Sequence, residues 1–534
     1  MKTERLPLAL TALAACGICT GALGADKAEK AGKAKPKPNV IIIYGDDVGF
    51  GDISCNGSRT ISTPNVDALA KSGIRFTNAH TTSSTSTPAR FGLLTGRYPW
   101  RLKGTDIATG DAGMIIAPGT CTVASMMQKA GYKTAAVGKW HLGLGETAKQ
   151  DWNGFITPGL KDIGFDYSFI MAATGDRVPC VYIENQRVYN YDPSAPIYVS
   201  YEKNFPGEPT GKDNPELLTK MQTGGGHNQS IVNGISRIGF MKGGGKALWV
   251  DEEIADVITG KAIDFIKANA KNPFFLYFGT NDIHVPRVPN ERFVGKSGMG
   301  PRGDAILSFD YSVGKLVEAL TTLGLIDNTI IILSSDNGPV LNDGYQDQAA
   351  ELLGDHKPWW IYRGGKYSAY EAGTRTPFIV KWNRDAGIQG GQVSNALVSH
   401  IDIMASLSQL EGLPMPAGAS PDGHSALPAL QGKDKTGRDW IVGQNAATTL
   451  TVLTSDGYKY IAPNPKAAAF NADRKTKTEM GNSADPQLYN TIVDPGEKND
   501  LSKQMPQKVE QLWAILNSVV GEGGFRAENG GFAK

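Results

Sequence analysis

Two pairs of oxygen-bearing side chains stand directly after apolar, β-branched segments of this sequence. They are Asp46-Asp47 and Asp336-Asn337. We expect these oxygens to lie close together, because ligands of open α/β sheets bind outside the carboxyl ends of the strands. An all-oxygen set suits Ca²⁺ or Mg²⁺, whereas zinc would normally bring His or Cys ligands. The pairs therefore indicate a cation site, although each pair alone is also typical of a helix cap or a turn.

Two more strand-like segments end in residues that can carry or transfer a proton. One segment runs into Lys139 and His141, and the other leads to His284. Lysine offers a positive charge to an anion, and histidine titrates near neutral pH. Because these residues follow strands of the same expected sheet, we expect them at the same edge as the acidic pairs.

A further feature is the serine-rich segment 83–97, in which Ser86, Pro88 and Arg90 are spaced as in the first turns of a helix. Ser86 is expected to cap this helix, with Pro88 in its first turn. A helix N-terminus attracts anions, and Arg90 lies one turn further along. Taken alone, the pattern predicts a capped helix and nothing else.

These residues need a scaffold, and the apolar pattern predicts one. Continuous apolar runs indicate strands that are buried on both faces, and amphipathic segments between them indicate helices. Their alternation predicts an α/β fold with a doubly wound, mixed but mostly parallel sheet flanked by helices. The expected strands span 40–44, 134–137, 274–278 and 329–333, and the expected helices span 63–72, 123–130, 252–269 and 304–323.

The chain is expected to divide into several parts. Residues 39–435 would form the catalytic domain, and the irregular, aromatic-rich stretch 150–250 suggests an insertion that faces substrate. Residues 436–534 predict a smaller C-terminal α+β subdomain, with an antiparallel sheet plus a helix. The turn signal at 455–457 joins two of its β-rich segments. An amphipathic helix after Pro506 would close the chain.

The N-terminus is typical of an exported protein. Residues 1–24 predict a signal peptide that is cleaved after residue 24, and a Lys/Pro-rich linker follows over 25–38. Alternatively, residues 13–16 resemble a lipobox, which would anchor the protein through a lipid on Cys16. We therefore expect a periplasmic or lipid-anchored protein. The mature chain contains no other apolar segment long enough to span a bilayer.

Composition narrows the possible functions. The chain has 54 Lys+Arg against 53 Asp+Glu, and this balance argues against a protein that binds nucleic acid. Hydrophobic residues make up 40% of the chain, which excludes a disordered protein. Cleavage after residue 24 would leave Cys55, Cys121 and Cys180, too few for a disulfide scaffold.

The longer motifs resemble the signatures of the formylglycine-dependent type I sulfatases, a family of the alkaline phosphatase superfamily. The segment 86–97 is similar to the first family signature in its serine form, and 131–141 is similar to the second. The resemblance extends from Asn39 to Leu501. Its shorter matches are 46–47, His284, 336–338, 363–366, 370–378, 488–490 and 494–497.

The resemblance implies covalent catalysis. In this family the Cys or Ser of the first signature is oxidised to formylglycine (3-oxoalanine), so Ser86 would be the modified residue. One hydroxyl of the hydrated aldehyde attacks the sulfur of a sulfate ester, and the second hydroxyl then loses its proton while sulfate is eliminated. The resemblance also implies one Ca²⁺, in preference to Mg²⁺. Its ligands would be Asp46, Asp47, Asp336, Asn337 and the modified Ser86.

Further roles follow by position from the same resemblance. Arg90 is expected to stabilise the formylglycine hydroxylate. Lys139 and Lys366 are expected to bind oxygens of the sulfate group, where negative charge must be neutralised. His141 is expected to accept the diol proton, and His284 is expected to protonate the leaving alcohol. His284 and both lysines would thus also contact the substrate.

Serine at position 86 departs from the cysteine that the aerobic formylglycine-generating enzyme oxidises. The chain therefore resembles serine-type sulfatases of anaerobic bacteria, and the implied partner is a radical-type sulfatase-maturing enzyme. Its overall pattern is similar to the subgroup of arylsulfatase A and N-acetylgalactosamine-6-sulfatase, and to carbohydrate sulfatases of the Bacteroides type. This likeness implies a sulfated host or dietary glycan, with the sulfate at O6 or O4 of galactose or N-acetylgalactosamine.

The sugar itself could be recognised by Asp176 and Arg177, which open the expected insertion. A carboxylate beside a guanidinium can bind sugar hydroxyls bidentately, although a surface ion pair would show the same pattern. His227 is a weaker candidate. Two alternative functions stay open: a phosphate or phosphonate ester hydrolase of the same superfamily, and a non-catalytic protein that binds sulfated glycans with Ser86 unmodified.

Overall fold

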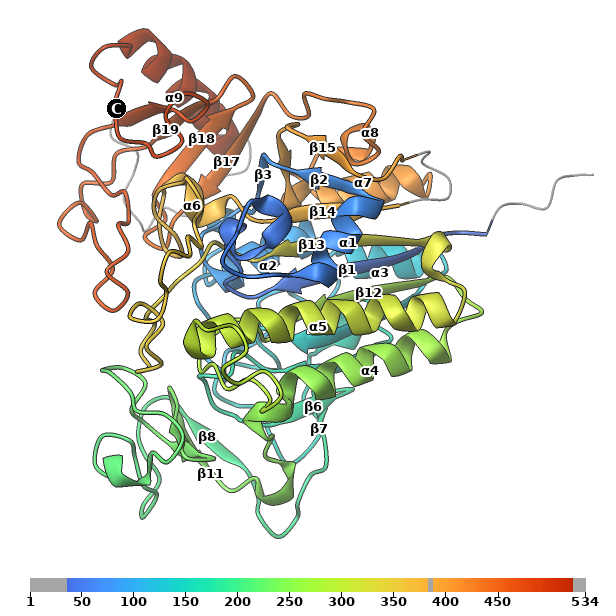
Figure 1. Ribbon diagram of the computed structural model, residues 1–534. Helices are drawn as coiled ribbons and strands as arrows, with labels where there is room; N and C mark the ends of the chain where they lie inside the picture. Colours follow the sequence, from blue (N-terminus) through green and yellow to red (C-terminus); the bar gives the residue numbers. More distant parts are fainter. Residues whose placement is uncertain (1–35, 383–387, 522–534) are drawn as a thin grey trace, which may run out of the picture. The chain divides into compact units, whose positions relative to one another are not determined.

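The computed structural model describes residues 36–382 and 388–521. The largest sheet in these ranges has ten strands in the order β15-β2-β14-β13-β1-β12-β4-β5-β6-β7 (Figure 1). Its central strands, from β13 to β5, all run parallel. The bounds are Asn39–Gly45 for β1, Ile74–Phe76 for β2, Lys133–Lys139 for β4, Tyr167–Met171 for β5, Tyr182–Glu184 for β6, Arg187–Val188 for β7, Phe274–Gly279 for β12, Thr329–Ser335 for β13, Phe378–Lys381 for β14 and Gln392–Ser394 for β15.

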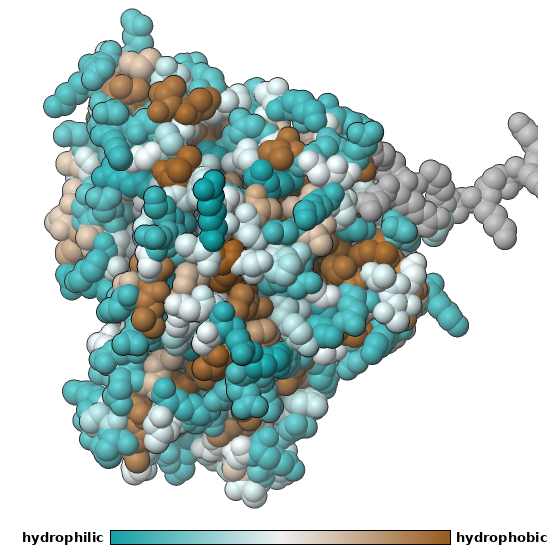
Figure 2. Space-filling model, in the orientation of Figure 1, coloured by the Kyte–Doolittle hydropathy of each residue, from teal (hydrophilic) through white to brown (hydrophobic). Residues whose placement is uncertain are grey.

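Helices cover both faces of this sheet, which explains its continuous apolar strands. Every residue of β1, β12 and β13 is buried, as expected for strands with a helix layer on each side. Helix α4 packs against α5, β4 and β12, while α3 packs against β4 and α7. Figure 1 shows α4 and α5 side by side in front of the sheet, and Figure 2 shows their outer surface as largely hydrophilic with small hydrophobic patches. The helices span Pro64–Ser72 (α1), Ser86–Thr95 (α2), Val123–Lys129 (α3), Ile254–Ala268 (α4), Gly300–Thr322 (α5), Glu371–Thr374 (α6), Ile403–Leu410 (α7), Leu427–Leu430 (α8) and Pro506–Gly521 (α9).

The predicted fold class is confirmed. The four expected strands are β1, β4, β12 and β13, and the four expected helices are α1, α3, α4 and α5. The sheet is mixed because β14 lies antiparallel to both β13 and β2, and because β6 and β7 turn back beside β5. These short edge strands lack the long apolar runs of the central strands, so the sequence pattern did not reveal them individually.

The expected insertion over 150–250 contains more regular structure than its composition suggested. Strands β5, β6 and β7 extend the main sheet, and two small antiparallel sheets pair β8 with β11 and β9 with β10. A further two-stranded sheet joins β3 and β16. These strands span Ala79–His80 (β3), Tyr198–Ser200 (β8), Ile231–Val232 (β9), Ile235–Ser236 (β10), Phe240–Lys242 (β11) and Val398–Ser399 (β16).

The C-terminal region forms a separate four-stranded antiparallel sheet, as predicted. Its strands are Trp440–Gln444 (β17), Leu450–Thr454 (β18), Tyr458–Ile461 (β19) and Gln487–Asn490 (β20). The turn between β18 and β19 places Gly457 at φ 86°, a conformation that favours glycine. Helix α9 packs against β18 and β19. It buries Leu512, Leu516 and Val519 in a hydrophobic cluster with residues of this sheet.

A buried ionic group joins the C-terminal sheet to helix α6. We call it the junction cluster, and it consists of Glu371, Arg375, Lys459 and Glu497. Lys459 Nζ lies 3.0 Å from Glu371 Oε1 and 3.3 Å from Glu497 Oε1. Arg375 Nη2 lies 2.6 Å from Glu371 Oε2. Two acids and two bases therefore balance each other in the interior.

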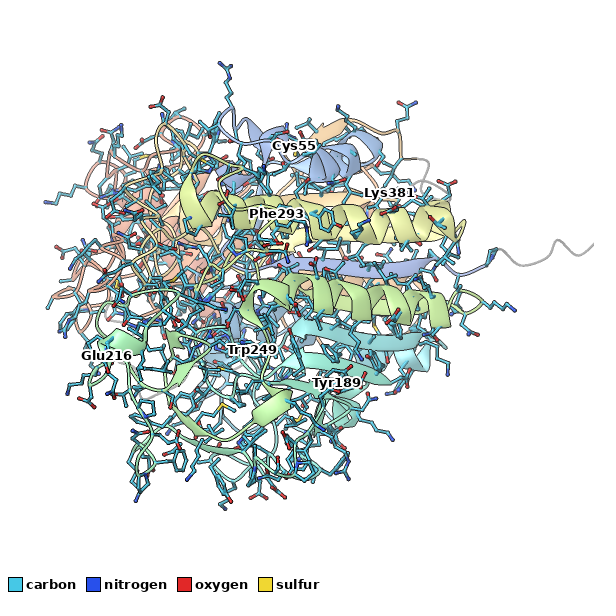
Figure 3. All side chains as sticks on the ribbon, turned by 60° about the horizontal axis from the view of Figure 1, so that its bottom comes forward. Cys55, Tyr189, Glu216, Trp249, Phe293 and Lys381 are labelled. Atoms are coloured by element: carbon cyan, nitrogen blue, oxygen red, sulfur yellow. The ribbon has the colours of Figure 1, made fainter. Side chains whose placement is uncertain are left out.

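Several sequence-based expectations stay predictions. The expected signal peptide 1–24, the lipidation candidate Cys16 and the linker up to residue 35 lie outside the described residues. The described residues from 37 onward form one compact unit, and the boundary expected near residue 436 is not tested by this grouping. Among the described residues, no helix combines the length and the apolar character that a membrane crossing needs. The three cysteines in this part of the chain, including Cys55 (Figure 3), are free thiols.

Candidate active site

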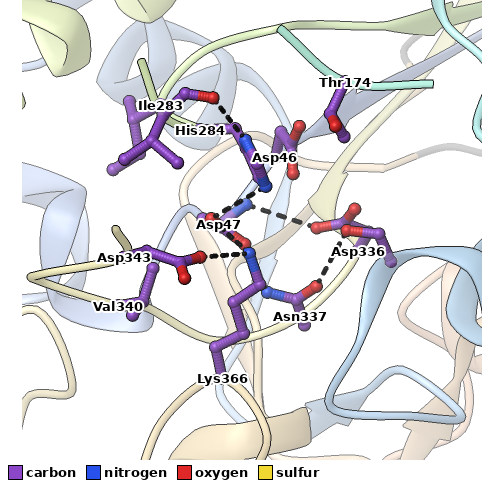
Figure 4. A network of polar contacts seen from close by, with 12 residues as sticks. Asp46, Asp47, Thr174, Ile283, His284, Asp336, Asn337, Val340, Asp343 and Lys366 are labelled. Atoms are coloured by element: carbon purple, nitrogen blue, oxygen red, sulfur yellow. Dashed lines mark hydrogen bonds and ion pairs between the residues drawn. The ribbon is translucent and has the colours of Figure 1, made fainter. Parts of the chain in front are cut away.

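Polar side chains converge at the carboxyl edge of the parallel strands (Figure 4). Asp46 and Asp47 directly follow β1, Asp336 and Asn337 directly follow β13, and Lys139 ends β4. All five are at most 1% exposed. The structure thus brings together residues that lie up to about three hundred positions apart in the chain, as the strand-end pattern led us to expect.

Hydrogen bonds connect the acidic residues of this edge. Asn337 Nδ2 donates to Asp47 Oδ1 at 2.8 Å, and the backbone N–H of Asp47 donates to Asp336 Oδ1 at 3.3 Å. Asp47 has a φ of 62°, in the left-handed region that Asp and Asn enter more readily than most residues. The backbone of the turn after β1 therefore sets the direction in which the Asp47 carboxylate points.

The oxygen atoms of this edge fit a divalent cation. Asp46 Oδ1 is buried and has no hydrogen-bond partner among the described residues. Single ligand atoms of Asp46, Asp47 and His284 lie within 4.8 Å of one another. Carboxylate and amide oxygens are the ligands that Ca²⁺ prefers. Asp46, Asp47, Asp336 and Asn337 could hold such an ion.

Charge and burial shift the pKa values of Asp46 and Asp336 in opposite directions. Burial raises the pKa of Asp46 well above its ordinary value, and the positive charge of Lys139 offsets this only in part. Burial acts in the same direction on Asp336, but the charges of Arg90 and Lys139 outweigh it and hold the pKa of Asp336 well below its ordinary value. A bound cation would favour the ionised form of both carboxyls.

Helix α2 carries Ser86 at its first residue, rather than as the N-cap that the sequence predicted. Thr85 is the N-cap, with extended backbone angles and no side-chain capping bond. The Ser86 hydroxyl instead faces the acidic edge. Its Oγ donates to Asn337 Oδ1 at 3.3 Å and accepts from Lys139 Nζ at 3.0 Å. All ten residues of α2 are buried.

Arg90 lies one turn along α2 and is locked against the same edge. Its Nε and Nη2 donate to Asp336 Oδ2 at 3.1 and 2.7 Å, and its Nη1 donates to Tyr277 OH at 2.9 Å. Burial alone would lower the pKa of Arg90, but Tyr277 and Asp336 raise it above the ordinary value. The guanidinium is therefore a fixed positive charge next to Asp336.

Two lysines contact the acidic edge from different elements. Lys139 Nζ donates to Asp46 Oδ2 at 2.6 Å. Lys366, in the connection before α6, donates from Nζ to Asp47 Oδ2 at 2.9 Å and to Asp343 Oδ2 at 3.2 Å. Burial lowers the pKa of Lys139. Burial also acts to lower the pKa of Lys366, but the charges of Asp47 and its neighbours together outweigh it and raise the pKa well above its ordinary value.

His141 presents one ring nitrogen with no partner. Its Nε2 lies 2.9 Å from the carbonyl oxygen of Ala108, which can only accept, so Nε2 carries the hydrogen. Nδ1 is buried and has no hydrogen-bond partner among the described residues. Burial, aided by the charge of Lys139, lowers the pKa of His141 well below its ordinary value. The neutral ring therefore offers a lone pair at Nδ1.

His284 has the opposite arrangement of its ring nitrogens. Its Nδ1 lies 2.7 Å from the carbonyl oxygen of Val285 and so carries a hydrogen. Its Nε2 faces the site, 3.9 Å from Asp47 Oδ2. Burial and the nearby charge of Lys366 lower its pKa well below the ordinary value.

Asp176 and Arg177 form a buried group with His227, rather than the surface ion pair that the sequence left open. Arg177 Nη1 lies 2.8 Å from Asp176 Oδ1, and His227 Nε2 lies 2.9 Å from Asp176 Oδ2. The Arg177 side chain is 15% exposed, against 3% for Asp176. His227, considered only a weaker candidate in the sequence, is thus part of this group.

Sequence reasoning missed two residues that support the site. Asp343 accepts hydrogen bonds from Lys366 and from the hydroxyl of Tyr367, and Tyr277 holds Arg90. The segment around Asp343 reads as an Asn-Asp-Gly turn, and Tyr277 lies inside an apolar strand. Neither pattern predicts an interaction with a lysine or an arginine far away in the chain.

The chain is similar in sequence to proteins that are already known. The sequence model of the Sulfatase family matches residues 38–413. The chain is 53% identical over 488 residues to the N-acetylgalactosamine-6-O-sulfatase of Bacteroides thetaiotaomicron, covering 91% of this chain and 94% of the relative. It is 30% identical to human arylsulfatase A over 88% of this chain and 84% of that protein.

A solved structure is similar over nearly the whole chain. It comes from work on the metabolism of multiple glycosaminoglycans by Bacteroides thetaiotaomicron. The TM-score is 0.88 at 53% sequence identity, and the match covers 90% of this chain and 99% of the other.

Proposed function

The chain belongs to the sulfatase family and is a sulfuric ester hydrolase, and on this premise we propose that it removes 6-O-sulfate from N-acetylgalactosamine in glycans. The observation that carries the proposal is the placement of Ser86, whose hydroxyl lies between Lys139 Nζ and Asn337 Oδ1 at the carboxyl edge of the sheet. The choice of sugar is supported by the 53% identity to an N-acetylgalactosamine-6-O-sulfatase.

The reaction needs a nucleophile and a neutralised sulfate group. Formylglycine made from Ser86 would supply a hydrated aldehyde as nucleophile, and Ca²⁺ would supply positive charge for the sulfate oxygens. Residue 86 and the oxygens of the edge would hold the ion. These oxygens belong to Asp46, Asp47, Asp336 and Asn337.

The chain's own cations would bind the sulfate group. Lys139 Nζ and Lys366 Nζ already lie against the carboxylates of the edge, so each can move a short distance to a sulfate oxygen. Arg90 is held by Asp336 and Tyr277 and would stabilise negative charge at residue 86. In a buried site such charges act more strongly than in water.

The two histidines would move protons at stated atoms. His141 would accept a proton at Nδ1, because its Nε2 is committed to the carbonyl of Ala108. His284 would deliver a proton from Nε2 to the leaving alcohol, because its Nδ1 is committed to Val285. An anionic sulfate bound nearby would raise the pKa of His284, since negative charge favours the imidazolium.

The group of Asp176, Arg177 and His227 would bind the sugar. Asp176 is fully engaged by its neighbours, so its orientation is fixed, and the partly exposed Arg177 can donate to a sugar hydroxyl. A purely binding role for the protein would not need a proton acceptor at His141 and a donor at His284. The arrangement therefore favours hydrolysis over the non-catalytic alternative.

Maturation and export are part of the proposal. A radical-type sulfatase-maturing enzyme would oxidise Ser86 before the chain is exported to the periplasm, as a soluble protein or as a lipoprotein anchored through Cys16. Mass spectrometry of the peptide that contains Ser86 tests this step. A mass equal to that of unmodified serine, after co-expression with a serine-type maturing enzyme, would contradict it.

The test of the activity is release of free sulfate by the matured protein. We expect 6-O-sulfated N-acetylgalactosamine to be desulfated with a higher kcat/KM than 4-O-sulfated N-acetylgalactosamine or 6-O-sulfated galactose. Phosphate esters of the same sugars serve as the comparison for the superfamily alternative. Faster hydrolysis of the phosphate esters than of the sulfate esters would overturn the proposal.

A further inference from the structure

A second pocket adjoins the candidate active site and is not used by the chemistry described above. It has a volume of about 730 Å³. Three separate parts of the chain line it: the insertion, the connection after β13, and the C-terminal region. Figure 1 shows the insertion (green) and the C-terminal region (red) at opposite ends of the left-hand side of the view. The lining residues used below are Gly344, Tyr345, Gln346, Glu351, Arg474 and Lys475.

This pocket shares a wall with the group that would bind the sugar. A Cβ atom placed on Gly344 would lie 2.0 Å from His227 Nδ1, so the glycine backbone lies directly against the imidazole. The ring of Tyr345 lies 4.9 Å from that of His227, centroid to centroid. His227 in turn contacts Asp176. The pocket therefore lies next to the group that would bind the sulfated sugar.

Two cations of the C-terminal region face this pocket. The guanidinium of Arg474 lies over the ring of Phe470, 5.2 Å from its centroid. Within the described ranges, neither this guanidinium nor the ammonium of Lys475 has an ion-pair or hydrogen-bond partner. A Cβ atom placed on Gly226 would lie 3.3 Å from Lys475 Nζ, so this ammonium is next to the residue that precedes His227. In contrast, Lys139 and Lys366 are fully engaged with carboxylates.

The loop that carries these cations is held in a defined conformation. Asp473 Oδ1 accepts hydrogen bonds from the backbone N–H groups of Lys475 and Thr476, at 3.0 and 2.8 Å. Glu479 forms an ion pair with Arg363 at 2.7 Å, which ties the end of the loop to the connection before α6. The two positive charges are thus presented by an ordered loop, which reduces the entropy lost on binding.

The remaining wall is suited to a polar ligand. Amide side chains such as Gln346 can exchange hydrogen bonds with sugar hydroxyls. Glu351 is the acid among the residues that line this pocket, so Arg474 and Lys475 leave it with an excess positive charge. An anionic sugar fits this balance better than a neutral one.

We propose that this pocket is a second, anion-binding subsite, in which Arg474 and Lys475 bind the carboxylate or sulfate of the sugar joined to the one that loses its sulfate. The inference rests on the proposed function and narrows its substrate to anionic oligosaccharides. It also assigns a role in substrate selection to the C-terminal region. The proposed roles of the residues at the hydrolytic site do not change.

The test compares substrates that differ only in the neighbouring sugar. The probes are 6-O-sulfated N-acetylgalactosamine alone, this sugar joined to glucuronic acid, the same disaccharide with its carboxyl group methylated, and a disaccharide whose neutral second sugar carries a sulfate. For the matured wild-type protein, we expect a higher kcat/KM with a charged disaccharide than with the methyl ester. The carboxylate and sulfate probes distinguish the two sources of the anion.

The variant R474A/K475A removes both cations. We expect its ratio of kcat/KM for the charged disaccharide over the monosaccharide to fall about tenfold, the order expected for two partly exposed charge pairs. The charge-preserving variant R474K/K475R should retain most of the ratio. Lys466→Ala is the matched control, because Lys466 is exposed in the same connection and does not line the pocket. An unchanged ratio in R474A/K475A would overturn the inference.

A binding experiment separates this inference from the proposed function. Calorimetric titration of the protein with unmodified Ser86 measures the affinity for each disaccharide without turnover. If the matured protein released no sulfate, the proposed function would fail. The subsite would still be supported by a loss of affinity for the charged disaccharide in R474A/K475A, and refuted by equal affinities in wild type and variant.

Discussion

Two of the buried ionic groups among the described residues differ in the balance of their charges. In the junction cluster, two carboxylates face two cations, Arg375 and Lys459. In the active-site cluster, four carboxylates face three cations. Buried polar atoms without a hydrogen-bond partner among the described residues occur in both groups, so the charge balance is what separates them. The active-site members are Asp46, Asp47, Asp336, Asp343, Arg90, Lys139 and Lys366.

The difference shows how a binding site can be told apart from a structural ion network. Burial and shifted pKa values occur in both groups, so neither property alone indicates function. In a balanced network the charges compensate one another, and removing one member leaves an uncompensated charge. An unbalanced network is completed either by a proton or by an additional cation, so one of its carboxylates is available to a bound metal ion. We accordingly expect changes in the two clusters to separate activity from stability.

The largest expected effect is that of Ser86→Ala on activity. Loss of the covalent nucleophile should reduce sulfate release by about 1,000-fold or more. The substitution removes one hydroxyl from the end of α2 and leaves no buried charge unpaired, so the melting temperature should change little. Sulfate release and thermal unfolding of the same preparation check both parts. A large loss of stability would show that the active-site cluster is mainly structural.

The next effect is that of Lys459→Met on stability. This substitution leaves Glu371 and Glu497 facing each other in the interior, and breaking a buried pair in this way costs about 3–5 kcal/mol. Chemical denaturation should show this decrease in the free energy of unfolding. The kcat of the folded protein should stay close to that of the wild type. A kcat that falls while stability is retained would reverse our assignment of the two clusters.

A smaller effect is expected for Asp46→Asn. The amide keeps one oxygen at the edge but removes a negative charge, so the cation should bind more weakly. We expect activity to fall about 100-fold at limiting Ca²⁺ and to recover in part when Ca²⁺ is raised, in line with typical losses for groups around a metal. A titration with EDTA and Ca²⁺ measures this. Equal Ca²⁺ dependence in variant and wild type would remove Asp46 from the ligand set.

The smallest effect concerns pH and the junction cluster. Burial, together with the charge of Glu371, raises the pKa of Glu497 to about 7, against an ordinary value of 4.5. The folded protein therefore binds this proton more tightly than the unfolded chain does, and its contribution to stability is complete below pH 4.5 and is lost as the pH rises to 7. Glu497→Gln should flatten this part of the stability curve. Denaturation at several pH values tests it, and a slope identical to the wild type would contradict it.

Much of the active-site cluster could be predicted from the sequence because strand ends are easy to locate. Asp46, Lys139 and Asp336 each follow a long apolar run, and parallel strands bring their ends to one edge. The same logic could not find Asp343 or Tyr277, because a turn and an apolar strand give no sign of a distant lysine or arginine. Their roles depend on how the connections fold over the sheet.

The sequence indicated some members of the junction cluster but not the contacts between them. Glu371 and Glu497 lie in segments that resemble family motifs, but Lys459 lies in an ordinary β-rich segment. Its contacts with both glutamates depend on the packing of the C-terminal sheet against α6. The second pocket shows the same limit more strongly, since its wall combines three loops from distant parts of the chain.

The complete burial of helix α2 bears on when Ser86 can be modified. Ser86 is 3% exposed at the first residue of a helix whose ten residues are all buried. The proposed maturing enzyme would therefore have to bind this segment before the chain folds. Under the proposed maturation, a serine that is not oxidised before folding would therefore stay unmodified in the folded protein.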